Sequence, residues 1–422
     1  MFAILLMRNA LFVLLLAGFG LCGCVVRYQR LDQAPRQTRL SADRIILPTT
    51  FIKDRPYVEL KINGKGPYLF LVDTGALGVS ITPQVAREAR VATSRKYVAK
   101  IIGASDDVEG QLMGLAGRIE SPGFSLEVVA VTILSPESAD LLLDRSGLAG
   151  GIIGMSAFRD VLLEIDFPQR KVSVAKRSGT TTPPGTGIAY TEQTPHVTLA
   201  TPSAQHGTIT ALIDTGGDGD FQLADIADYP VRAGLVKADA YTFGIGGYWR
   251  AQVGQLSGDI RLGTAIWRNP AIYTSGRKGE NLIGSKALAS WKVVLDQGRK
   301  LPWVLEENQM SITTWDGPVE SDGRPVVYGF AAIPDSGGML VKEVDAGSRA
   351  ERAGLKVGDR IVSVTAGPGG SGQTANSRRT RLGGALPANR RSSKSPCRFP
   401  IHFLRNEQRR CSPASRGNDL PV

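Results

Sequence analysis

Two aspartates in this chain occur in the same short motif. The tripeptide Asp-Thr-Gly stands at residues 73–75 and again at residues 214–216. Each copy follows an apolar run, residues 69–72 and 211–213, so each predicts a buried strand that stops at a carboxylate. A carboxylate at the end of an apolar strand is costly unless something uses it. If the two carboxylates meet, they can share one proton, so that one acts as a base while the other acts as an acid.

The sequence around the two motifs is repeated. An alternating segment and a glycine-marked turn precede each motif and predict a β-hairpin. Two aliphatic residues and a glycine follow each motif, and after them come a short helix-like stretch and a strand pair. Four features in the same order predict a duplicated domain, which is what the two carboxylates need in order to meet. The corresponding segments are 56–60 and 195–199 (first strand), 152–154 and 282–284 (aliphatic-glycine triplet), and 161–174 and 292–303 (strand pair).

The repeat divides the chain into units of ordinary domain size. Short alternating strands dominate both copies and predict a mostly β fold. A segment rich in threonine, proline and glycine, residues 179–185, is the predicted linker between them. We expect one lobe at residues 47–178 and a second at residues 188–315.

The two motifs resemble the active-site loops of the aspartic peptidases. The triplets at residues 152–154 and 282–284 are similar to those of the retropepsin branch, where an aliphatic pair and a glycine cross behind the active-site loop. Retropepsins usually supply one motif per chain and dimerise, whereas this chain supplies both. The resemblance therefore implies two tandem retropepsin-like lobes that pair with each other, as in bilobed pepsins, to form one cleft in a monomer.

The resemblance also implies roles for the residues of the motifs. Asp73 and Asp214 would be the catalytic pair that activates a water against a peptide bond. Like charges held close together cannot both ionise cheaply, so the pair shares one proton; aspartic proteases are the standard example of this principle. The threonines would bond across to the opposing loop, and the glycines let the two loops approach each other. These supporting residues are Thr74, Gly75, Thr215 and Gly216.

The implied activity is that of an aspartic-type endopeptidase, a hydrolase that acts on protein or peptide substrates without a metal or an organic cofactor. Each lobe should also carry a flap, a mobile β-hairpin between its aspartate and its triplet. Glycine-containing segments at residues 100–105 and 243–249 are the candidates, and Tyr248 is either a substrate contact or an exposed residue of a hairpin tip. The flap candidates are Ile102, Gly103, Gly246 and Tyr248.

A third unit follows the second lobe. Residues 338–344 and 347–364 resemble part of a PDZ domain, most specifically in the alanine-rich helix, the Ala-Gly-Leu turn and the Gly-Asp-Arg-Ile strand start. A PDZ domain needs one more helix and a closing strand, which the following sequence does not predict. We therefore expect a truncated PDZ-like module at residues 324–365. By the resemblance, its loop would hold a peptide C-terminal carboxylate on the backbone N–H groups of Tyr328, Gly329 and Phe330.

The positive charge of the chain is concentrated at its C-terminal end. Residues 366–422 contain 11 Lys and Arg residues and 2 Asp and Glu residues, which is +9 of the net +11 of the chain. A basic tail is not a basic groove, and we find no interleaved aromatic platform in it, so we expect no nucleic-acid partner. The tail, residues 366–422, is predicted to be solvated and disordered.

The N-terminal segment predicts export from the cytoplasm. Arg8 is the only charged residue before Arg27, and most of the residues between them are apolar. The sequence Leu-Cys-Gly-Cys at residues 21–24 resembles a bacterial lipobox, whose last cysteine is lipidated and becomes the mature N-terminus. We expect a signal peptide at residues 1–23, a lipid anchor on Cys24 and a linker at residues 24–46. An ordinary signal peptide or an uncleaved membrane anchor are the alternatives.

All three interpretations of the N-terminal segment place the body of the protein on the periplasmic side of the cell envelope. Val25 follows the lipobox cysteine, where an aspartate would resemble an inner-membrane retention signal, so an outer-membrane lipoprotein is favoured over a secreted or inner-membrane-anchored protein. Two other functions remain open from the sequence. One is a catalytically inactive, bilobed peptide-binding protein, and the other is a scaffold whose PDZ-like part is the functional unit.

Overall fold

The structure is a computed structural model in which most of the described chain forms β-strands, as the sequence predicts. No helix among the described residues is long and apolar enough to cross a membrane. The signal peptide and Cys24 lie outside the described residues. These residues are 34–102, 108–136, 139, 149–177, 187–190, 194–204, 207–244, 247–274, 279–306, 312–313, 325–335, 338–364 and 401–404.

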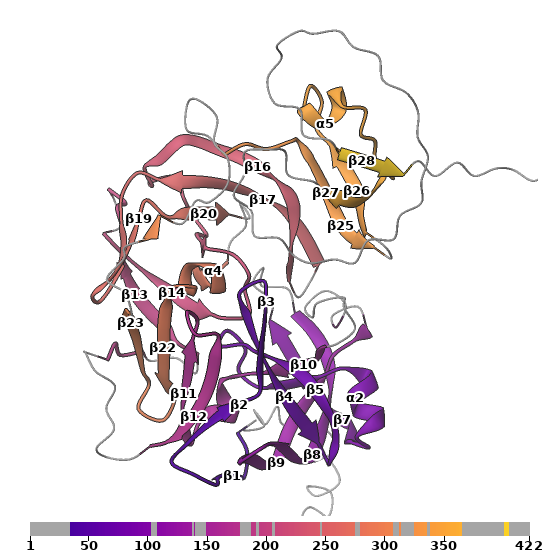
Figure 1. Cartoon of the computed structure of the whole chain (residues 1–422), viewed down its shortest axis with the longest axis vertical. Coiled ribbons are helices and arrows are strands. Elements are labelled where there is room, and N and C mark those ends of the chain that lie inside the picture. Colours follow the sequence, from indigo (N-terminus) through magenta and orange to yellow (C-terminus); the bar gives the residue numbers. More distant parts are fainter. Residues whose placement is uncertain are drawn as a thin grey trace, which may run out of the picture.

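The first copy of the repeat forms a closed β-barrel, drawn in indigo and purple in Figure 1. Its strands pair in the order β4–β5–β10–β6–β9–β8, and β8 pairs with β4 to close the ring. Two pairs in this ring are parallel, β5–β10 and β6–β9. The short helix α2 (Pro83–Glu88) is capped at its N-terminus by Thr82, whose hydroxyl accepts a hydrogen bond from the Val85 N–H. The strands are β1 (Gln37–Leu40), β3 (Thr49–Ile52), β4 (Arg55–Ile62), β5 (Lys65–Val72), β6 (Val79–Ile81), β7 (Ala92–Ile102), β8 (Val108–Ser121), β9 (Phe124–Ile133) and β10 (Ala149–Ile153).

The second copy has the same order of strand pairings. The β13–β14 hairpin pairs through β14 with β21 in parallel, β21 pairs with β15, and β15 pairs in parallel with β20. β18 pairs with β13 as β8 pairs with β4 in the first barrel. The segments that correspond in sequence therefore occupy corresponding places in the two sheets. The strands are β13 (His196–Ala200), β14 (Thr208–Asp214), β15 (Phe221–Gln222), β16 (Val231–Gly244), β17 (Gly247–Leu256), β18 (Ile260–Leu262), β19 (Ala265–Arg268), β20 (Ala271–Thr274), β21 (Leu282–Gly284) and β24 (Ile312–Thr313).

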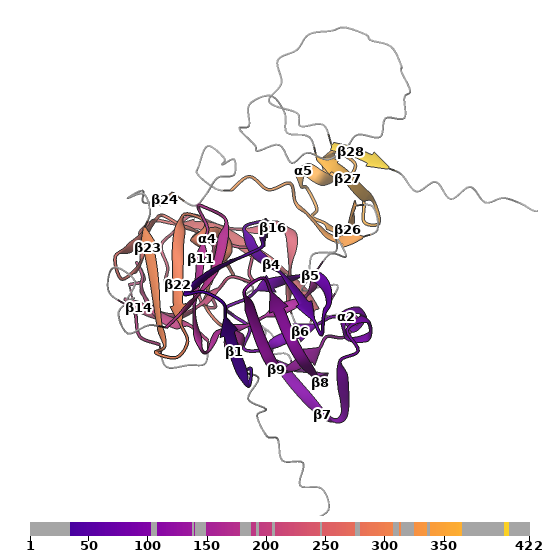
Figure 2. The same cartoon turned by 60° about the horizontal axis from the view of Figure 1, so that its bottom comes forward.

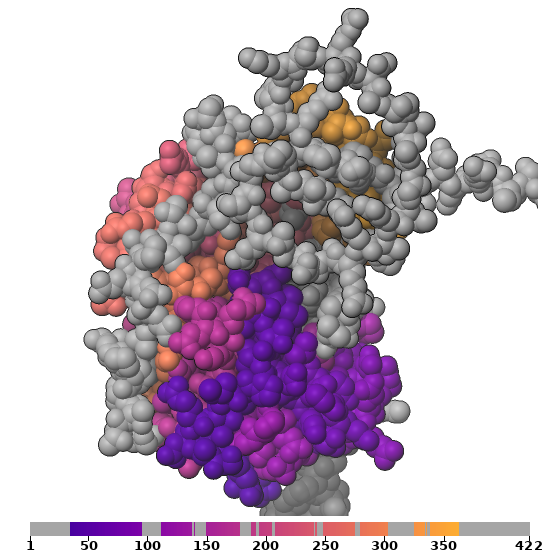
Figure 3. Space-filling model, in the orientation of Figure 1, coloured from indigo at the N-terminus to yellow at the C-terminus, as the bar shows by residue number. Residues whose placement is uncertain are grey.

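A five-stranded antiparallel sheet joins the two copies. Its order is β2–β12–β11–β22–β23, and the pairing of β11 with β22 crosses from the first copy to the second. Each predicted strand pair supplies two strands of this sheet. Figure 3 shows the two copies in contact along the face of the molecule that it presents. The strands are β2 (Arg44–Leu47), β11 (Val161–Asp166), β12 (Lys171–Lys176), β22 (Trp291–Asp296) and β23 (Leu301–Glu306).

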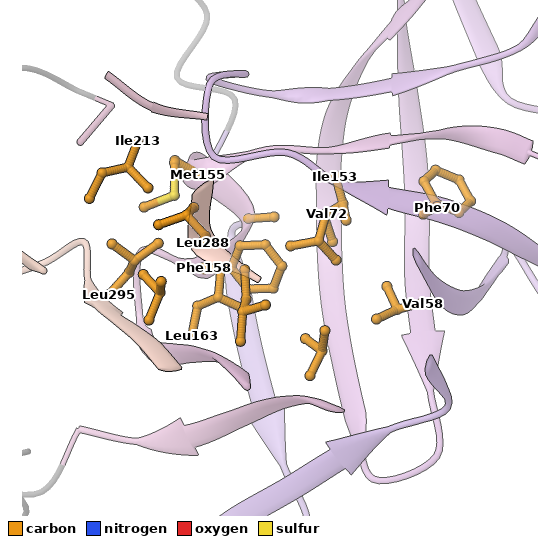
Figure 4. Packing of buried hydrophobic residues seen from close by; sticks show 14 of the residues in the cluster. Val58, Phe70, Val72, Ile153, Met155, Phe158, Leu163, Ile213, Leu288 and Leu295 are labelled. Atoms are coloured by element: carbon orange, nitrogen blue, oxygen red, sulfur yellow. The ribbon is translucent and has the colours of Figure 1, made fainter. Parts of the chain in front are cut away.

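One apolar core runs through both copies and the joining sheet. Val72 and Leu163 of the first copy belong to the same cluster as Ile213 and Leu295 of the second, as Figure 4 shows. The 3-10 turn η1 (Met155–Phe158) and the helix α4 (Ser285–Leu288) supply further residues to it. Burial of each such side chain contributes roughly 1.5–3 kcal/mol. Because the core is continuous, the two strand ends that carry the aspartates are held in one fixed relation.

A small third unit follows, at residues 325–364. Strands β25 (Phe330–Asp335), β26 (Gly338–Val344) and β27 (Arg360–Val364) form its antiparallel sheet, and α5 (Arg349–Arg352) packs on it through Ala350. The first of these strands, β25, also pairs in parallel with β16. In Figure 2 this C-terminal unit projects from the two copies of the repeat on the side where β16 lies.

One short strand lies within the segment for which the sequence predicts disorder. Strand β28 (Ile401–Leu404) pairs antiparallel with β27, so four residues of the 366–422 tail differ from that prediction. The physical reason is that β27 ends the sheet of the C-terminal unit, and an open edge offers N–H and C=O groups to another strand.

The buried carboxylate of Asp296 generates a prediction about stability. Its side chain is fully buried, and Arg177 Nε donates to its Oδ1 at 2.8 Å, next to the β11–β22 junction. Arg177→Met should lower the free energy of unfolding in urea by about 3 kcal/mol, because a buried charge loses its partner. The matched control is Arg299→Met, since Arg299 is half-exposed and lies 3.6 Å from the same carboxylate. We expect less than about 1 kcal/mol for it, and equal losses in both variants would contradict the prediction.

Candidate active site

Each aspartate lies where a strand in a parallel pair ends. Asp73 follows β5, and its N–H donates to the carbonyl of Ile153 in β10 at 3.1 Å. Asp214 is the last residue of β14 and stands opposite Gly284 of β21. In both copies the partner strand is the aliphatic-glycine triplet that the sequence singled out.

The glycine of each triplet allows the strand to pass close to the active-site loop. The Gly154 N–H donates to the backbone carbonyl of Gly78 at 3.0 Å, and the Gly284 N–H donates to the backbone carbonyl of Asp220 at 2.7 Å. A Cβ on Gly154 would lie 2.4 Å from the carbonyl oxygen of Ala76, and one on Gly284 would lie 2.2 Å from that of Gly219. Both distances are too short for any side chain, so the two triplets fix the loops from behind.

The two motif threonines exchange four hydrogen bonds across the junction. Thr74 Oγ1 donates to the carbonyl of Ile213 at 2.5 Å and accepts from the Thr215 N–H at 3.1 Å. Thr215 Oγ1 donates to the carbonyl of Val72 at 2.7 Å and accepts from the Thr74 N–H at 3.1 Å. Both threonines are fully buried. This symmetric exchange binds the loop of one copy to the loop of the other.

The glycines after the threonines bring the two carboxyl groups together. A Cβ on Gly75 would lie 2.7 Å from Asp214 Oδ1, and a Cβ on Gly216 would lie 2.5 Å from the carboxyl carbon of Asp73. Each loop therefore packs directly against the opposite carboxyl, and each carboxyl acts on the pKa of the other. The structure thus brings together all six residues of the two motifs.

Backbone donors orient both carboxyls. Asp73 Oδ1 accepts from the N–H groups of Gly75 and Ala76 at 2.8 and 3.0 Å. Asp214 Oδ1 accepts from those of Gly216 and Gly217 at 2.9 and 3.2 Å. One oxygen of each group is therefore fixed by its own loop. Both side chains keep part of their surface open to solvent.

The dense surroundings of the pair favour its retaining a proton. Burial raises the pKa of Asp214 to about 8, and the neighbouring charge and hydrogen bond of Asp73 act in the same direction. Burial also raises the pKa of Asp73, but its hydrogen bonds from Ala76, Asp214 and Gly75 and the charge of Arg55 oppose that rise. The two groups titrate as a pair that shares one proton, and the pKa values belong to the pair.

Two further residues support the site without having been singled out from the sequence. Ser285 is fully buried, and its hydroxyl donates to the carbonyl of Thr215 at 2.7 Å. Its position directly after the second triplet was the available signal. Arg55, at the start of β4, places a positive charge near Asp73, and a cross-strand proximity of this kind has no signal in the sequence.

The remaining predicted site residues lie elsewhere or outside the described chain. Ile102 ends β7 and Tyr248 belongs to β17, so both are in the predicted hairpins, whereas Gly103 and Gly246 are outside the described residues. Tyr248 is 45% exposed and packs edge-to-face on Tyr241. Phe330 is the first residue of β25, and the N–H groups of Tyr328 and Gly329, which precede it, bind Asp239 of β16, away from the Asp73–Asp214 pair. Within the described ranges, no cluster of histidine, cysteine or acidic residues could hold a metal ion.

A comparison with known families gives a match over part of the first copy of the repeat. Residues 58–157 match the family model Asp_protease_2, described as aspartyl protease. The matched stretch includes the motif at residues 73–75 and the triplet at residues 152–154. It supports an aspartic peptidase domain in the first barrel and suggests aspartic peptidase activity. The comparison with curated proteins found no match.

The threonine exchange gives a prediction with a matched control. Thr74→Val keeps the shape of the side chain but leaves the buried Ile213 carbonyl and Thr215 N–H without partners. The free energy of unfolding should fall by about 2–4 kcal/mol, measured by denaturant titration. Thr74→Ser retains the hydroxyl and should lose much less. A Val variant as stable as the Ser variant would show that the exchange does not hold the loops together.

Proposed function

We propose that this protein is an aspartic endopeptidase whose single active site is built from both copies of the repeat. The observation that carries the proposal is the reciprocal hydrogen bonding of Thr74 and Thr215, which supports Asp73 and Asp214 in direct contact. Catalytic groups need rigid support of this kind. The two copies would act as the lobes of a bilobed enzyme, with the peptide substrate in a cleft between them.

The two carboxyls would divide the roles of base and acid. The charged carboxyl of the Asp73–Asp214 pair would take a proton from a water molecule as that water attacks the peptide carbonyl carbon. The other carboxyl, which carries the shared proton, would give it to the carbonyl oxygen. When the tetrahedral intermediate collapses, the C–N bond breaks, the proton taken from the water passes to the departing nitrogen, and the second carboxyl takes a proton back from a hydroxyl of the intermediate. Each cycle consumes one water and returns the pair to its starting protonation.

The hairpins β7–β8 and β16–β17 would serve as flaps over the bound peptide. Each follows its aspartate and precedes its triplet in the chain, and each is a long antiparallel pair. A flap excludes water from the reaction and adds contacts to the substrate. We also propose that residues 325–364 are a PDZ-like module and that Cys24 carries a lipid that tethers the enzyme to the periplasmic side of the cell envelope, favouring the outer membrane.

Cleavage of a mixed peptide library by the full-length protein tests the proposed activity. Asp73→Asn and Asp214→Asn should each reduce the rate by at least about 10³-fold, because either change removes the shared-proton pair. Activity should also be lost as the pH rises through about 8, the raised pKa of Asp214, since the pair then loses the shared proton that one of its carboxyls must donate.

Asp259→Asn is the matched control for the loss of one carboxylate. Asp259 pairs with Arg261 on the surface and lies outside the active-site loops. The Asp259→Asn variant should cleave the peptide library at the same rate as the unmodified protein. A folded protein that cleaves nothing between pH 3 and pH 8 would favour the inactive peptide-binding protein.

The proposed anchor has its own test. In a bacterial host grown with an alkyne-bearing fatty acid, the protein should incorporate the label and fractionate with membranes. Cys24→Ser should abolish the labelling, while Cys22→Ser, two residues away, should retain it. Equal labelling of the two variants, or none in the unmodified protein, would count against the lipid anchor.

A further inference from the structure

The C-terminal unit holds a carboxylate that belongs to the second copy of the repeat. The backbone N–H of Tyr328 donates to Asp239 Oδ2 at 2.6 Å, and that of Gly329 donates to Oδ1 at 2.9 Å. Two successive N–H groups thus converge on one carboxylate, and the adjacent Phe330 N–H acts in the same direction as these two by lowering the pKa of Asp239.

The backbone of this loop has the shape of an anion-binding nest. Gly329 has a φ of 82°, in the left-handed region that favours glycine, and this directs neighbouring N–H groups toward the same point. A Cβ on Gly329 would lie 2.3 Å from the Cβ of Ser348, so only glycine fits. We call the N–H groups of residues 328–330 the nest.

An arginine fastens the same contact from the other strand of the hairpin. Arg250 of β17 is only 7% exposed at its side chain and makes a bidentate pair with Asp345, with both N–O distances 2.7 Å. It also donates to the carbonyls of Ala238 in β16 and Phe330 in β25. Arg250 therefore links both strands of the hairpin to the C-terminal unit.

The β16 strand also covers the edge of β25. The two strands pair in parallel at Ala240 and Ala332, one residue beyond Asp239. An edge strand beside a nest is the arrangement that captures an extended peptide and its terminal carboxylate. Here both positions are taken by the chain itself, although the strand contact is limited to one pair of residues and is therefore weak.

We propose that Asp239 is an internal ligand of the nest, which latches the β16–β17 hairpin to the C-terminal unit until the free C-terminal carboxylate of a peptide displaces it. A peptide that binds the nest and the edge of β25 must remove Asp239 and part of β16. Binding at the C-terminal unit would then free the hairpin. The consequence for proteolysis rests on the proposed function, whereas the exchange of one carboxylate for another does not.

Hydrogen exchange and peptide binding test the latch without any assay of cleavage. The full-length protein would be incubated with a pool of hexapeptides that have free C-terminal carboxylates, and in parallel with the same pool amidated. The acid pool should accelerate amide exchange in β16 and β17, and the amidated pool should not. Asp239→Asn should accelerate the same amides without peptide and tighten binding of the acid pool by about tenfold or more, because hydrogen bonds to a charged group are lost.

Asp225→Asn is the matched control for removal of a carboxylate in the same copy of the repeat. Asp225 accepts from the Ala227 N–H in a turn before β16 and touches no residue of the nest. The Asp225→Asn variant should show the same amide exchange and the same peptide binding as the unmodified protein. Equal binding of acid and amide pools, or unchanged exchange of the hairpin in Asp239→Asn, would overturn the proposal. Because neither readout uses the Asp73–Asp214 pair, a failure of the latch is distinguishable from a lack of peptidase activity.

Discussion

The site depends on one interaction, the exchange of four hydrogen bonds between Thr74 and Thr215. Both side chains are fully buried, so each polar atom must find a partner within the protein. The partners lie in the opposite copy of the repeat, and neither loop can satisfy its threonine alone. The two carboxyls are in contact because the residues beside them have no other way to complete their hydrogen bonding.

The hydrogen bonds between the two threonines require a fixed relation between the two copies of the repeat. The joining sheet and the shared apolar core hold the copies in that relation. Strands β11 and β22 pair across the two copies, and their apolar residues continue into the cores behind β5 and β14. Strands β5 and β14 therefore both end where the two copies of the repeat meet. A family match over residues 58–157 agrees with this arrangement in the first barrel, where the strand into Asp73 and the triplet behind it both lie.

The C-terminal unit is connected to the second copy of the repeat through the β16–β17 hairpin. Asp239 and Arg250 stand on the two strands of the β16–β17 hairpin, and both bind residues 328–345 through charged groups. Burial raises the pKa of Asp239, while the nest and Arg250 act to lower it, so the nest compensates much of the cost of burying this carboxylate. A contact of this strength between a hairpin and a separate unit can couple binding at one to motion at the other.

The sequence by itself determined the mostly β fold class and pointed to the two candidate catalytic carboxylates. Alternating strands, the repeated Asp-Thr-Gly motifs and the matching triplets predicted a duplicated, mostly β protein and named Asp73 and Asp214, because these signals are local and need only short stretches of chain. Sequence patterns did not reveal the contributions of Ser285 and Arg55, the strand β28, or the contact of the nest with Asp239. Asp239 and Gly329 are 90 positions apart. Only the tertiary structure decided these four features, because contacts between distant segments depend on how the sheets pack. Such contacts leave no periodic pattern in the sequence.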